Sequence, residues 1–463
     1  MLCLSLLISL AAGPKRNATL LMLADCDAVA AWHDDAFLAC HSPNPSSGIM
    51  SAYAVRLHVK TGKRVYMTQI GEGHAFTAAF RIKVDTQGFA YAAGFTREHA
   101  FPTTPDAVQK IYGGGDSDAF LVKVSPNGKI VYSTLLGGSG AEQGNGLELD
   151  GAGGIFVGGT TWSADFPGAK RAAVGADAFV AHFRPGDPTS LETIVFGGSG
   201  EEKLTGLASD RHGGLFAVGY TKSTDFPVVK PVQGSLKGVS DLFLTRLVDM
   251  STTFSTYFGG SGDDSGWGVT VDRKGNPVVA GTTDSPDLPT TIGVFQPKSG
   301  GKLDAFIAKF KGLGYQTVRA TYFGGTGDDS SGYDGDDIKI DATGNVWFAG
   351  LTGSSDLPMK RPLQAKYGGG NADGFLAAFS SDLSQLCFAT YNGGSDRDIL
   401  EGLDIAQNGT ILASGLTFSA DFPDRFGVAP VLLGELKVNA LLLHVSARCR
   451  PLKIKTLHNA LQM

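Results

Sequence analysis

The sequence predicts an all-β fold: a seven-bladed β-propeller of four-stranded antiparallel blades, with the ring closed by an N-terminal strand that completes the last blade. Three observations lead to this prediction. Glycine supplies 64 of the 463 residues, about twice its usual share, which indicates many turns. Three short motifs recur in one order along the chain. Each repeating unit holds four runs of strand length, and none shows the 3.6-residue periodicity of an amphipathic helix.

Three motifs define the repeating unit. Asp-Phe-Pro, or Asp-Leu-Pro, recurs with its proline at positions 102, 167, 227, 289, 358 and 423, although Ala100 replaces the first aspartate. Asp-x-Phe begins at Asp118, Asp177, Asp241, Asp304 and Asp373. A pair of glycines occurs at 137/138, 197/198, 259/260, 324/325 and 393/394. Because the three anchors keep one order, we interpret them as a tandem repeat of about 60–70 residues.

Each unit predicts four strands joined by turns. In the fifth unit the strands are predicted at residues 267–271, 277–282, 305–310 and 318–323. The first two are joined by a turn in which Gly275 accepts positive φ and Asp272 hydrogen-bonds its own turn backbone. Four antiparallel strands in a tandem unit of this length are typical of propeller blades.

The ring is predicted from the innermost strand of each unit. These strands are expected to start near residues 28, 75, 143, 204, 266, 335 and 400. The divergent first unit is expected to form strands at 29–32, 36–39, 52–59 and 64–70. The last unit ends after its third strand, 440–445, so residues 18–23 are expected to supply the fourth. Such closure removes an open sheet edge.

The residues from Tyr257 to Asp272, Tyr-Phe-Gly-Gly-Ser-Gly-Asp-Asp-Ser-Gly-Trp-Gly-Val-Thr-Val-Asp, carry a resemblance to a known family. With 275–276, 281–283, 287–289 and 304–306, they resemble the bacterial seven-bladed β-propeller repeat, the SBBP repeat family. The resemblance covers about residues 70 to 445; the first unit lacks the Gly-Gly and Asp-Phe-Pro elements. It implies an exported or cell-surface protein without defined catalytic residues.

Composition narrows the functional classes. With 39 basic and 45 acidic residues, the chain has neither the basic surface typical of nucleic-acid binding nor a polybasic membrane patch. Residues 1–13 are read as a signal peptide, residues 14–449 as the propeller and residues 450–463 as a C-terminal tail. No later segment is long and apolar enough to cross a membrane. We therefore expect a secreted or cell-surface monomer.

Two cysteines are candidates for a disulfide. Cys26 and Cys40 are equidistant from His33, so in a hairpin that turns there they would face each other, and export would permit the bond. The alternative is that both remain reduced.

Acidic residues recur at the start of the units: Glu72, Glu142, Glu201, Glu202, Asp263, Asp264, Asp328, Asp329, Asp396 and Asp398. Either they form a carboxylate ring for a hard cation, or each accepts backbone hydrogen bonds in its own turn. We favour the turn, because a feature of every blade serves something every blade needs. The aspartates of Asp-Phe-Pro and Asp-x-Phe are interpreted as structural in the same way, with the Phe and Pro packing between blades.

The sixth unit departs from the others by a four-residue insert. It concentrates five carboxylates in ten residues, and we identify these as the candidate metal ligands, with calcium as the expected cation: Asp328, Asp329, Asp334, Asp336 and Asp337. The alternative is a solvated acidic loop.

Enzyme motifs are sparse: the sequence has no H-E-x-x-H pattern and no G-x-S-x-G elbow. His74, beside Glu72, is the histidine we would test as a base. The predicted function is a non-catalytic binding or scaffolding module for a protein or glycan, bound on the channel-side face. The alternative is a propeller enzyme, a glycan- or lactone-directed hydrolase or lyase with a divalent cation at the channel mouth.

Overall fold

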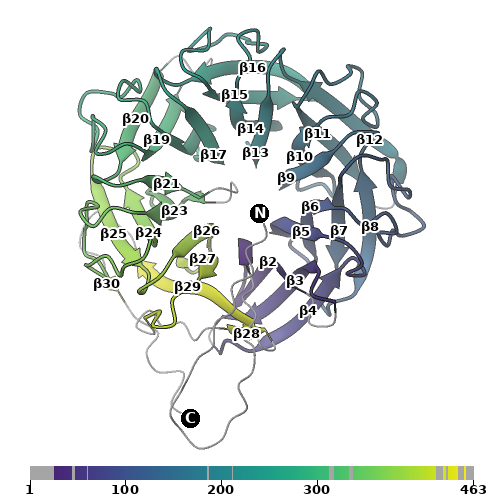
Figure 1. Cartoon of the computed structure of the whole chain (residues 1–463), viewed down its shortest axis with the longest axis horizontal. Coiled ribbons are helices and arrows are strands. Elements are labelled where there is room, and N and C mark those ends of the chain that lie inside the picture. The colour runs from purple at the N-terminus through teal and green to yellow at the C-terminus, as the bar shows by residue number, and fades with distance from the viewer. Residues whose placement is uncertain are drawn as a thin grey trace, which may run out of the picture.

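The computed structural model describes residues 25–454, apart from 44–46, 60, 185–186, 211, 312–316, 333–336, 424–430, 434–435 and 447–452. Its strands pair into seven antiparallel sheets, which follow one another around a ring (Figure 1). We number these sheets as blades one to seven in chain order. The prediction of an all-β propeller with four-stranded antiparallel blades is confirmed.

The strands of the first four blades are regular. Blade one contains β1 (Asp25–Trp32), β2 (Asp35–Pro43), β3 (Met50–His58) and β4 (Arg64–Ile70). Blade two contains β5 (Thr77–Val84), β6 (Ala90–Thr96), β7 (Asp118–Val124) and β8 (Ile130–Leu136). Blade three contains β9 (Glu142–Leu149), β10 (Ile155–Thr161), β11 (Asp177–Arg184) and β12 (Asp187–Phe196). Blade four contains β13 (Glu202–Ser209), β14 (Gly214–Thr221), β15 (Asp241–Val248) and β16 (Ser251–Phe258).

Blade five has four strands, whereas blades six and seven have five each. Blade five contains β17 (Asp264–Val271), β18 (Pro277–Thr283), β19 (Asp304–Lys311) and β20 (Thr317–Phe323). Blade six contains β21 (Asp329–Ser331), β22 (Ile338–Ile340), β23 (Val346–Thr352), β24 (Asp373–Phe379) and β25 (Leu386–Asn392). Blade seven contains β26 (Asp398–Ile405), β27 (Thr410–Thr417), β28 (Val431–Leu433), β29 (Leu436–Ser446) and β30 (Lys453–Ile454).

The insert of blade six lies inside the innermost strand, which corrects the prediction of one strand starting near Gly335. Asp329–Ser331 already pairs with β23, and pairing resumes at Ile338–Ile340. Three residues on each side of the insert pair with β23. The innermost strand of blade six is therefore divided into β21 and β22.

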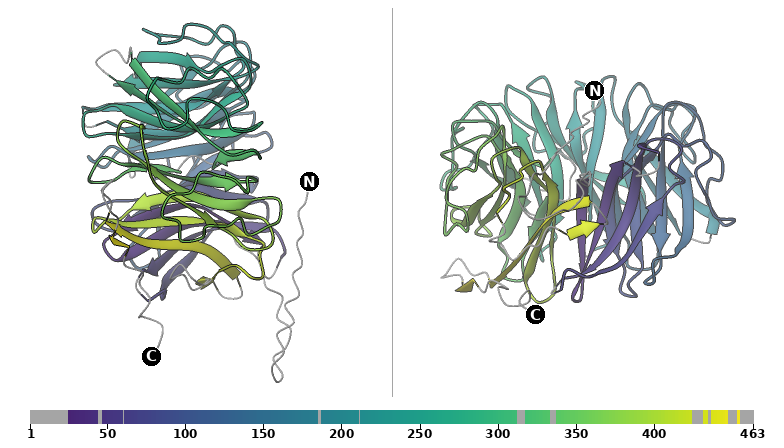
Figure 2. Two further views of the ribbon diagram at one scale, coloured as in Figure 1. Left: turned by 90° about the vertical axis from the view of Figure 1, so that its left-hand side faces the viewer. Right: turned by 60° about the horizontal axis from the view of Figure 1, so that its bottom comes forward.

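The ring closes where the first and last blades meet. Strand β1 packs against β26 and β27, and the yellow C-terminal strands lie beside the purple first sheet in Figure 2. The Ala31 amide donates a hydrogen bond of 2.7 Å to Asp404 Oδ2 across this boundary. In blade seven, β28 and β30 pair with the two ends of β29. The strand expected at residues 18–23 and the signal peptide expected at 1–13 lie outside the described residues.

The repeated phenylalanines build the core. The Phe of Asp-x-Phe is completely buried in five blades, and the Phe of Asp-Phe-Pro stacks on it. The ring centroids of Phe166 and Phe179 lie 4.5 Å apart, and those of Phe226 and Phe243 lie 5.1 Å apart. Because these rings belong to clusters that span neighbouring blades, the motif secures inter-blade packing, as predicted.

The innermost strands share a β-bulge that explains one class of glycine. In blade three, Gly144 pairs with Gly159 and Gly146 pairs with Gly158, so Asn145 is the extra residue. At the bulge a carbonyl of the innermost strand points at the second strand: a Cβ on Gly159 would lie 1.8 Å from the Gln143 carbonyl oxygen. In the six blades that have this close approach, only glycine fits. The equivalent glycines are Gly94, Gly159, Gly219, Gly281, Gly350 and Gly415.

Candidate functional site

The acid that begins each innermost strand is part of a turn. Glu202 is completely buried and accepts hydrogen bonds from the Gly198 amide at 2.9 Å and from the hydroxyls of Thr221 and Ser223. Burial raises the pKa of this carboxyl, and the three donors oppose that shift. Equivalent buried acids occur at Glu142, Asp264, Asp329 and Asp398. For these residues the structural interpretation is confirmed.

The aspartate of Asp-Phe-Pro closes the same turn from the other side. Asp225 Oδ1 accepts hydrogen bonds from the Ser199 amide at 2.8 Å and from the Ser199 hydroxyl at 2.9 Å. These bonds lower the pKa of Asp225. The other members of this set repeat the geometry: Asp165 with Ser139, Asp287 with Ser261, Asp356 with Thr326 and Asp421 with Ser395. We call this contact the turn latch.

Blade two also has a buried carboxylate in this turn, but the carboxylate and the hydroxyl residue have exchanged positions. Thr77 occupies the position of the acid and Glu98 occupies the position of the serine, as the pairing of Thr77 with Thr96 shows. Glu98 is buried and its Oε2 accepts a hydrogen bond of 3.0 Å from the Glu72 amide. The carboxylate is therefore retained although it comes from the opposite strand. Sequence reasoning missed this exchange, which only an alignment on strand register could have found.

The five carboxylates predicted as a calcium site have different environments. Asp329 holds its own turn by accepting from Gly325, Thr352 and Ser354. Asp328 is exposed, and Asp337 is completely buried. Asp334 and Asp336 lie outside the described residues. A calcium site in this loop stays a prediction.

Asp337 enters the interior of the ring. Its side chain lies so close to Gly268 of blade five that a Cβ there would be 2.0 Å from Asp337 Oδ1. Burial raises its pKa to about 7, although Ser331 and the positive charges of Arg81 and Lys339 act in the opposite direction. Burial therefore favours the protonated form of Asp337 relative to an exposed aspartate.

Arg81 crosses the same region. It is 2% exposed, and its two terminal nitrogens donate hydrogen bonds of 2.7 Å to the carbonyls of Phe80 in blade two and Thr205 in blade four. A side chain that joins innermost strands two blades apart occupies space at the centre of the ring. At this level the channel is narrowed by protein.

In six blades the bulge places one variable residue on the innermost strand, and the innermost strands surround the ring centre in Figure 1. Sequence reasoning missed this set, because the residues of one strand do not show which residues of the neighbouring strand lie opposite them. In blades one to five and blade seven the bulge residues are Asp27, Phe80, Asn145, Thr205, Trp267 and Glu401. In blade six the insert falls at the same place.

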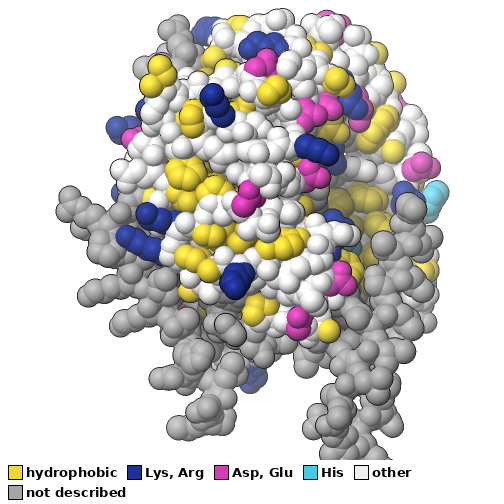
Figure 3. All heavy atoms as spheres, turned by 60° about the vertical axis from the view of Figure 1, so that its left-hand side comes forward, with side chains coloured by type: hydrophobic (Ala, Val, Ile, Leu, Met, Phe, Trp, Pro, Cys, Tyr) yellow, Lys and Arg dark blue, Asp and Glu magenta, His cyan; other side chains and the backbone are white. Residues whose placement is uncertain are grey.

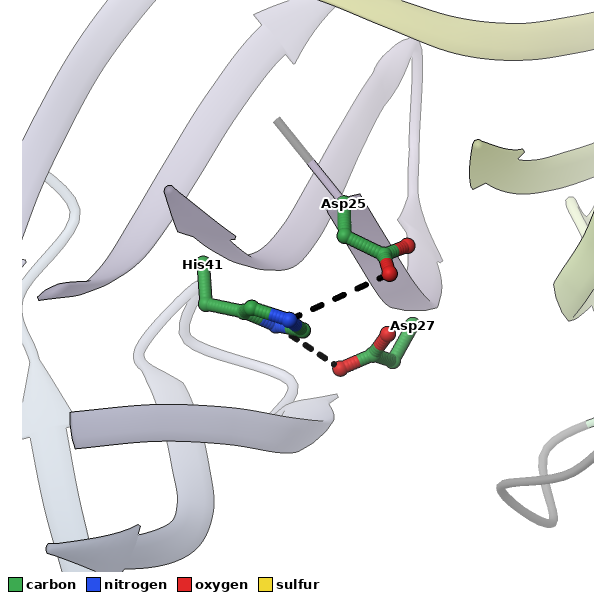
Figure 4. Close-up of side chains that lie close together, drawn as sticks. All are labelled: Asp25, Asp27 and His41. Atoms are coloured by element: carbon green, nitrogen blue, oxygen red, sulfur yellow. Dashed lines mark ion pairs between the residues drawn. The ribbon is translucent and has the colours of Figure 1, made fainter. Parts of the chain in front are cut away.

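Blade one gathers two carboxylates and an imidazole. His41 on β2 points toward Asp25 and Asp27 on β1 (Figure 4). His41 Nδ1 lies 3.2 Å from Asp27 Oδ2, and His41 Nε2 lies 3.9 Å from Asp25 Oδ2. One ligand atom from each residue lies within 4.8 Å of the others. Among the residues that the structure describes, this is the group with the composition and spacing of a metal site.

A disulfide adjoins this group. The bond between Cys26 and Cys40 joins strands whose Cα atoms are 4.0 Å apart, so the predicted pairing is confirmed. Cys40 occupies the position at which the other six blades have the close-approach glycine, so the bond forms where the strands already lie close together. Cys387 is also disulfide-bonded.

A large hollow lies on the face opposite to the turn latches. It has a volume of about 1320 Å³ and is formed by the first turns of blades four, five and six with adjoining strand ends. Its wall includes two ion pairs, Asp210 with Arg246 at 2.6 Å and Asp272 with Lys309 at 2.9 Å. Its cationic side chains are Lys230, Arg246, Arg273, Lys274, Lys309 and Lys311.

Two further observations concern the predicted sites and the membrane. His74 lies 3.6 Å from Glu72, but their side chains are 74% and 59% exposed, which gives His74 no enclosed site in which to act as a base. Within the described residues there is no helix with the length and apolarity of a membrane span.

The repeated blades define a β-propeller, and comparison with known proteins agrees. Residues 131–167 match the model of a family described as a beta-propeller repeat, SBBP, so the resemblance predicted from the sequence is confirmed for that stretch. Regulatory protein FlaEY of Caulobacter vibrioides is 26% identical over 320 residues, which make up 64% of this chain and 32% of that protein. The chain thus spans about a third of the length of this curated relative.

Two solved structures match most of the length of this chain at low sequence identity. A Mycobacterium tuberculosis puromycin-hydrolyzing peptidase matches over 93% of this chain and 53% of its own, with 14% identity and a TM-score of 0.46. The β-propeller domain of the Trilobed protease from Pyrococcus furiosus matches over 86% of this chain and 92% of its own, with 8% identity and a TM-score of 0.43.

Proposed function

We propose that this chain is an exported, non-catalytic binding or scaffolding propeller that holds an anionic protein segment or glycan in the hollow over blades four to six. The observation that carries the proposal is the hollow with its excess of positive charge. The sequence alone favoured the channel-side face as the ligand surface. The proposal moves the ligand to the opposite face, because side chains narrow the channel while the hollow is open.

The charge balance of the hollow supports an anionic ligand. Arg246 and Lys309 are committed to ion pairs. The side-chain charges of the other four cations have no ion-pair partner among the described residues; these open cations are Lys230, Arg273, Lys274 and Lys311. Of the four carboxylates that line the hollow, Asp210 and Asp272 belong to these ion pairs, while Asp341 and Asp382 accept hydrogen bonds in their own turns and keep their charge. With six cations against four carboxylates, the side chains of the hollow carry a net positive charge.

The side of the molecule displayed in Figure 3 offers no comparable excess. Figure 3 shows basic and acidic side chains interspersed over the side of the molecule that it displays, without an extended region of one sign. The whole chain carries a net charge of −6. Attraction for an anion must then come from the local field of the hollow, and it should weaken as salt is added.

Titration with polygalacturonate and with poly-L-glutamate, followed by calorimetry, tests the proposal and distinguishes a glycan from a protein ligand. Saturable binding is expected, and replacement of the four open cations by glutamine should weaken it by at least tenfold. A matched variant removes four exposed cations elsewhere, Lys63, Arg64, Lys110 and Lys129. If both variants lose affinity equally, net charge rather than the hollow is responsible and the proposal fails.

Export is part of the proposal. It is supported by the Cys26–Cys40 bond and by the disulfide at Cys387, since such bonds persist in oxidising compartments. Mass spectrometry of protein isolated from its native compartment without reductant should find Cys26 and Cys40 linked. Free thiols at both positions would contradict export.

The closing strand at residues 18–23 and a start of the propeller at residue 14 are also proposed, whereas its expected end at residue 449 is moved by β30. Among the described strands, the part of β29 from residue 439 to 444 pairs with β27, while β28 and β30 pair only with its ends. One edge of β29 is thus available for a further strand. β30 lies within residues 450–463, so part of the predicted tail joins the last blade.

A further inference from the structure

We propose that Asp25, Asp27 and His41 form a binding site for a divalent transition-metal ion, with Zn²⁺ as the representative ion. The proposal concerns blade one and does not depend on the hollow over blades four to six. It rests on where these residues depart from the repeat, on their geometry and on how their strands are fixed.

Register shows that the three residues are particular to blade one. Asp25 pairs with His41, and Asp27 is the residue at the bulge. The equivalent residues in blade three are Gln143, Thr160 and Asn145. In blade five they are Ser265, Thr282 and Trp267. Across the seven blades only blade one combines two carboxylates with an imidazole at these positions, within the part of the chain that the structure describes.

The propeller itself does not need such residues at these positions. In blade five the contact between the bulge residue and the second strand is a neutral hydrogen bond of 3.1 Å from Trp267 Nε1 to Thr282 Oγ1. Asp27 and His41 make the corresponding contact in blade one. Since a neutral pair suffices in blade five, the concentration of ligands in blade one points to a separate role.

The ligand atoms are close enough to converge on one ion. Zn²⁺ binds imidazole nitrogen and carboxylate oxygen at about 2.0–2.2 Å, so ligands in a tetrahedral site lie roughly 3.3 Å apart. The atoms here lie within 4.8 Å of one another, and rotation of the aspartate side chains can supply the difference. The side chains of His41 and Asp25 are 15% and 25% exposed, which leaves a path for the ion and for water as a fourth ligand.

The backbone around the ligands is fixed. Cys26 stands between the two aspartates and Cys40 precedes His41, and the disulfide joins them. Asp27 is 1% exposed, and one oxygen of Asp25, Oδ1, is shielded from solvent without a hydrogen bond from any described residue. A covalent link beside all three ligands lowers the cost of bringing them together, and the ion would neutralise charge that is otherwise buried.

The ligand set selects the class of ion. Ca²⁺ prefers six to eight oxygen ligands, whereas imidazole with carboxylate suits zinc and its first-row neighbours. This distinguishes the site from the calcium site predicted in the insert of blade six.

The test is titration of the EDTA-treated full chain with Zn²⁺ by calorimetry, and with Co²⁺ by visible absorption. We expect saturable binding of one ion, a rise in the melting temperature with Zn²⁺, and Co²⁺ bands that report nitrogen ligation. Asp27→Asn with His41→Thr should weaken Zn²⁺ binding by at least a hundredfold. This variant carries the pair found in blade three and should retain its metal-free melting temperature. His182→Asn is the control, because His182 lies 3.2 Å from the Asp150 carboxylate but is not part of a three-residue ligand group among the described residues.

Three outcomes would overturn the proposal: no saturable Zn²⁺ binding by the wild-type chain, binding unchanged in the double variant, or Co²⁺ bands without nitrogen ligation. Any of them would leave His41 as the structural partner of two carboxylates. If the double variant does not fold, Asp25→Gln provides the blade-three residue at the third position, and the wild-type Co²⁺ spectrum still decides whether the imidazole is a ligand.

Discussion

Buried carboxylates should make the protein less stable as the pH rises from about 5 to about 6.5. Burial raises the pKa of Asp118 to about 7, and the negative charge of Glu142 adds to the shift, although the Gly113 amide opposes it. Burial also raises the pKa of Asp337 and of Asp373 to about 7 and that of Asp264 to about 6. In the unfolded chain these groups release their protons near pH 3.8.

The sign and size of the effect follow from proton linkage. Between pH 3.8 and 7 the folded state holds protons that the unfolded state has lost, so the free energy of unfolding falls by about 1.4 kcal/mol per pH unit for each such group. The free energy of unfolding begins to fall above the pKa of the group in the unfolded state and stops falling above its pKa in the folded state. With three groups near 7 and one near 6, the wild-type slope should lie between about −3.5 and −5 kcal/mol per pH unit over this range.

Asp118→Asn isolates one group. The amide oxygen can still accept the hydrogen bond that the Gly113 amide donates at 2.8 Å, and the side chain no longer titrates. Urea unfolding followed by tryptophan fluorescence at several pH values should give a slope shallower by about 1.4 kcal/mol per pH unit. A slope unchanged from wild type would refute the reasoning.

Asp272→Asn is the control for Asp118→Asn. Although burial acts to raise its pKa, hydrogen bonds from Asn276 and Lys309 prevail and hold it at about 2. Asp272 is thus ionised in both states above pH 5, and its removal should change the stability but not the slope. A changed slope in this variant would show that the pH dependence does not report individual carboxyl groups.

Three further predictions concern the scaffold. Glu98→Ser should destabilise the fold by about 1–3 kcal/mol, because the Glu72 amide loses its acceptor; adding Thr77→Glu should restore most of that loss in urea unfolding, and additive losses would contradict the exchange. Gly219→Ala should cost about 3 kcal/mol, since its Cβ would lie 1.9 Å from the Lys203 carbonyl oxygen, whereas Gly234→Ala, whose nearest neighbour is 3.8 Å away, should be neutral. Deletion of residues 14–24 should cause aggregation or loss of cooperative melting, and a truncated chain that melts like the full chain would exclude the closing strand.

The fold could be predicted from the sequence because the same motifs recur in successive units, so the pattern of one blade can be checked against the others. In blade five the predicted 277–282 and 318–323 differ from the observed Pro277–Thr283 and Thr317–Phe323 by one residue at one end. Even the divergent first blade was located, since it keeps apolar runs of strand length, and three of its four strands are mostly buried. Blade six was misplaced because the insert interrupts a strand, and a count of residues cannot tell an interrupted strand from a longer loop.

The candidate site was harder to predict for the same physical reason. Asp25, Asp27 and His41 come together through strand pairing across a bulge, and the register shift is invisible in the spacing of the residues. The equivalence of Cys40 to the close-approach glycines also depends on register. The acidic insert attracted attention because its carboxylates are adjacent in sequence, yet Asp329 and Asp337 have different surroundings in space.

The turn latch bears on how such proteins change in evolution. The aspartate is 26 residues from its serine partner in four blades and 30 residues from its threonine partner, Thr326, in blade six, so the latch closes within one repeating unit. A gene duplication that adds a unit therefore brings its own latch and needs no matching change in its neighbours. The boundary between blades one and seven depends instead on single residues such as Asp404. Blade number can drift by duplication in the middle of the chain, while the junction of its ends constrains where new units are tolerated.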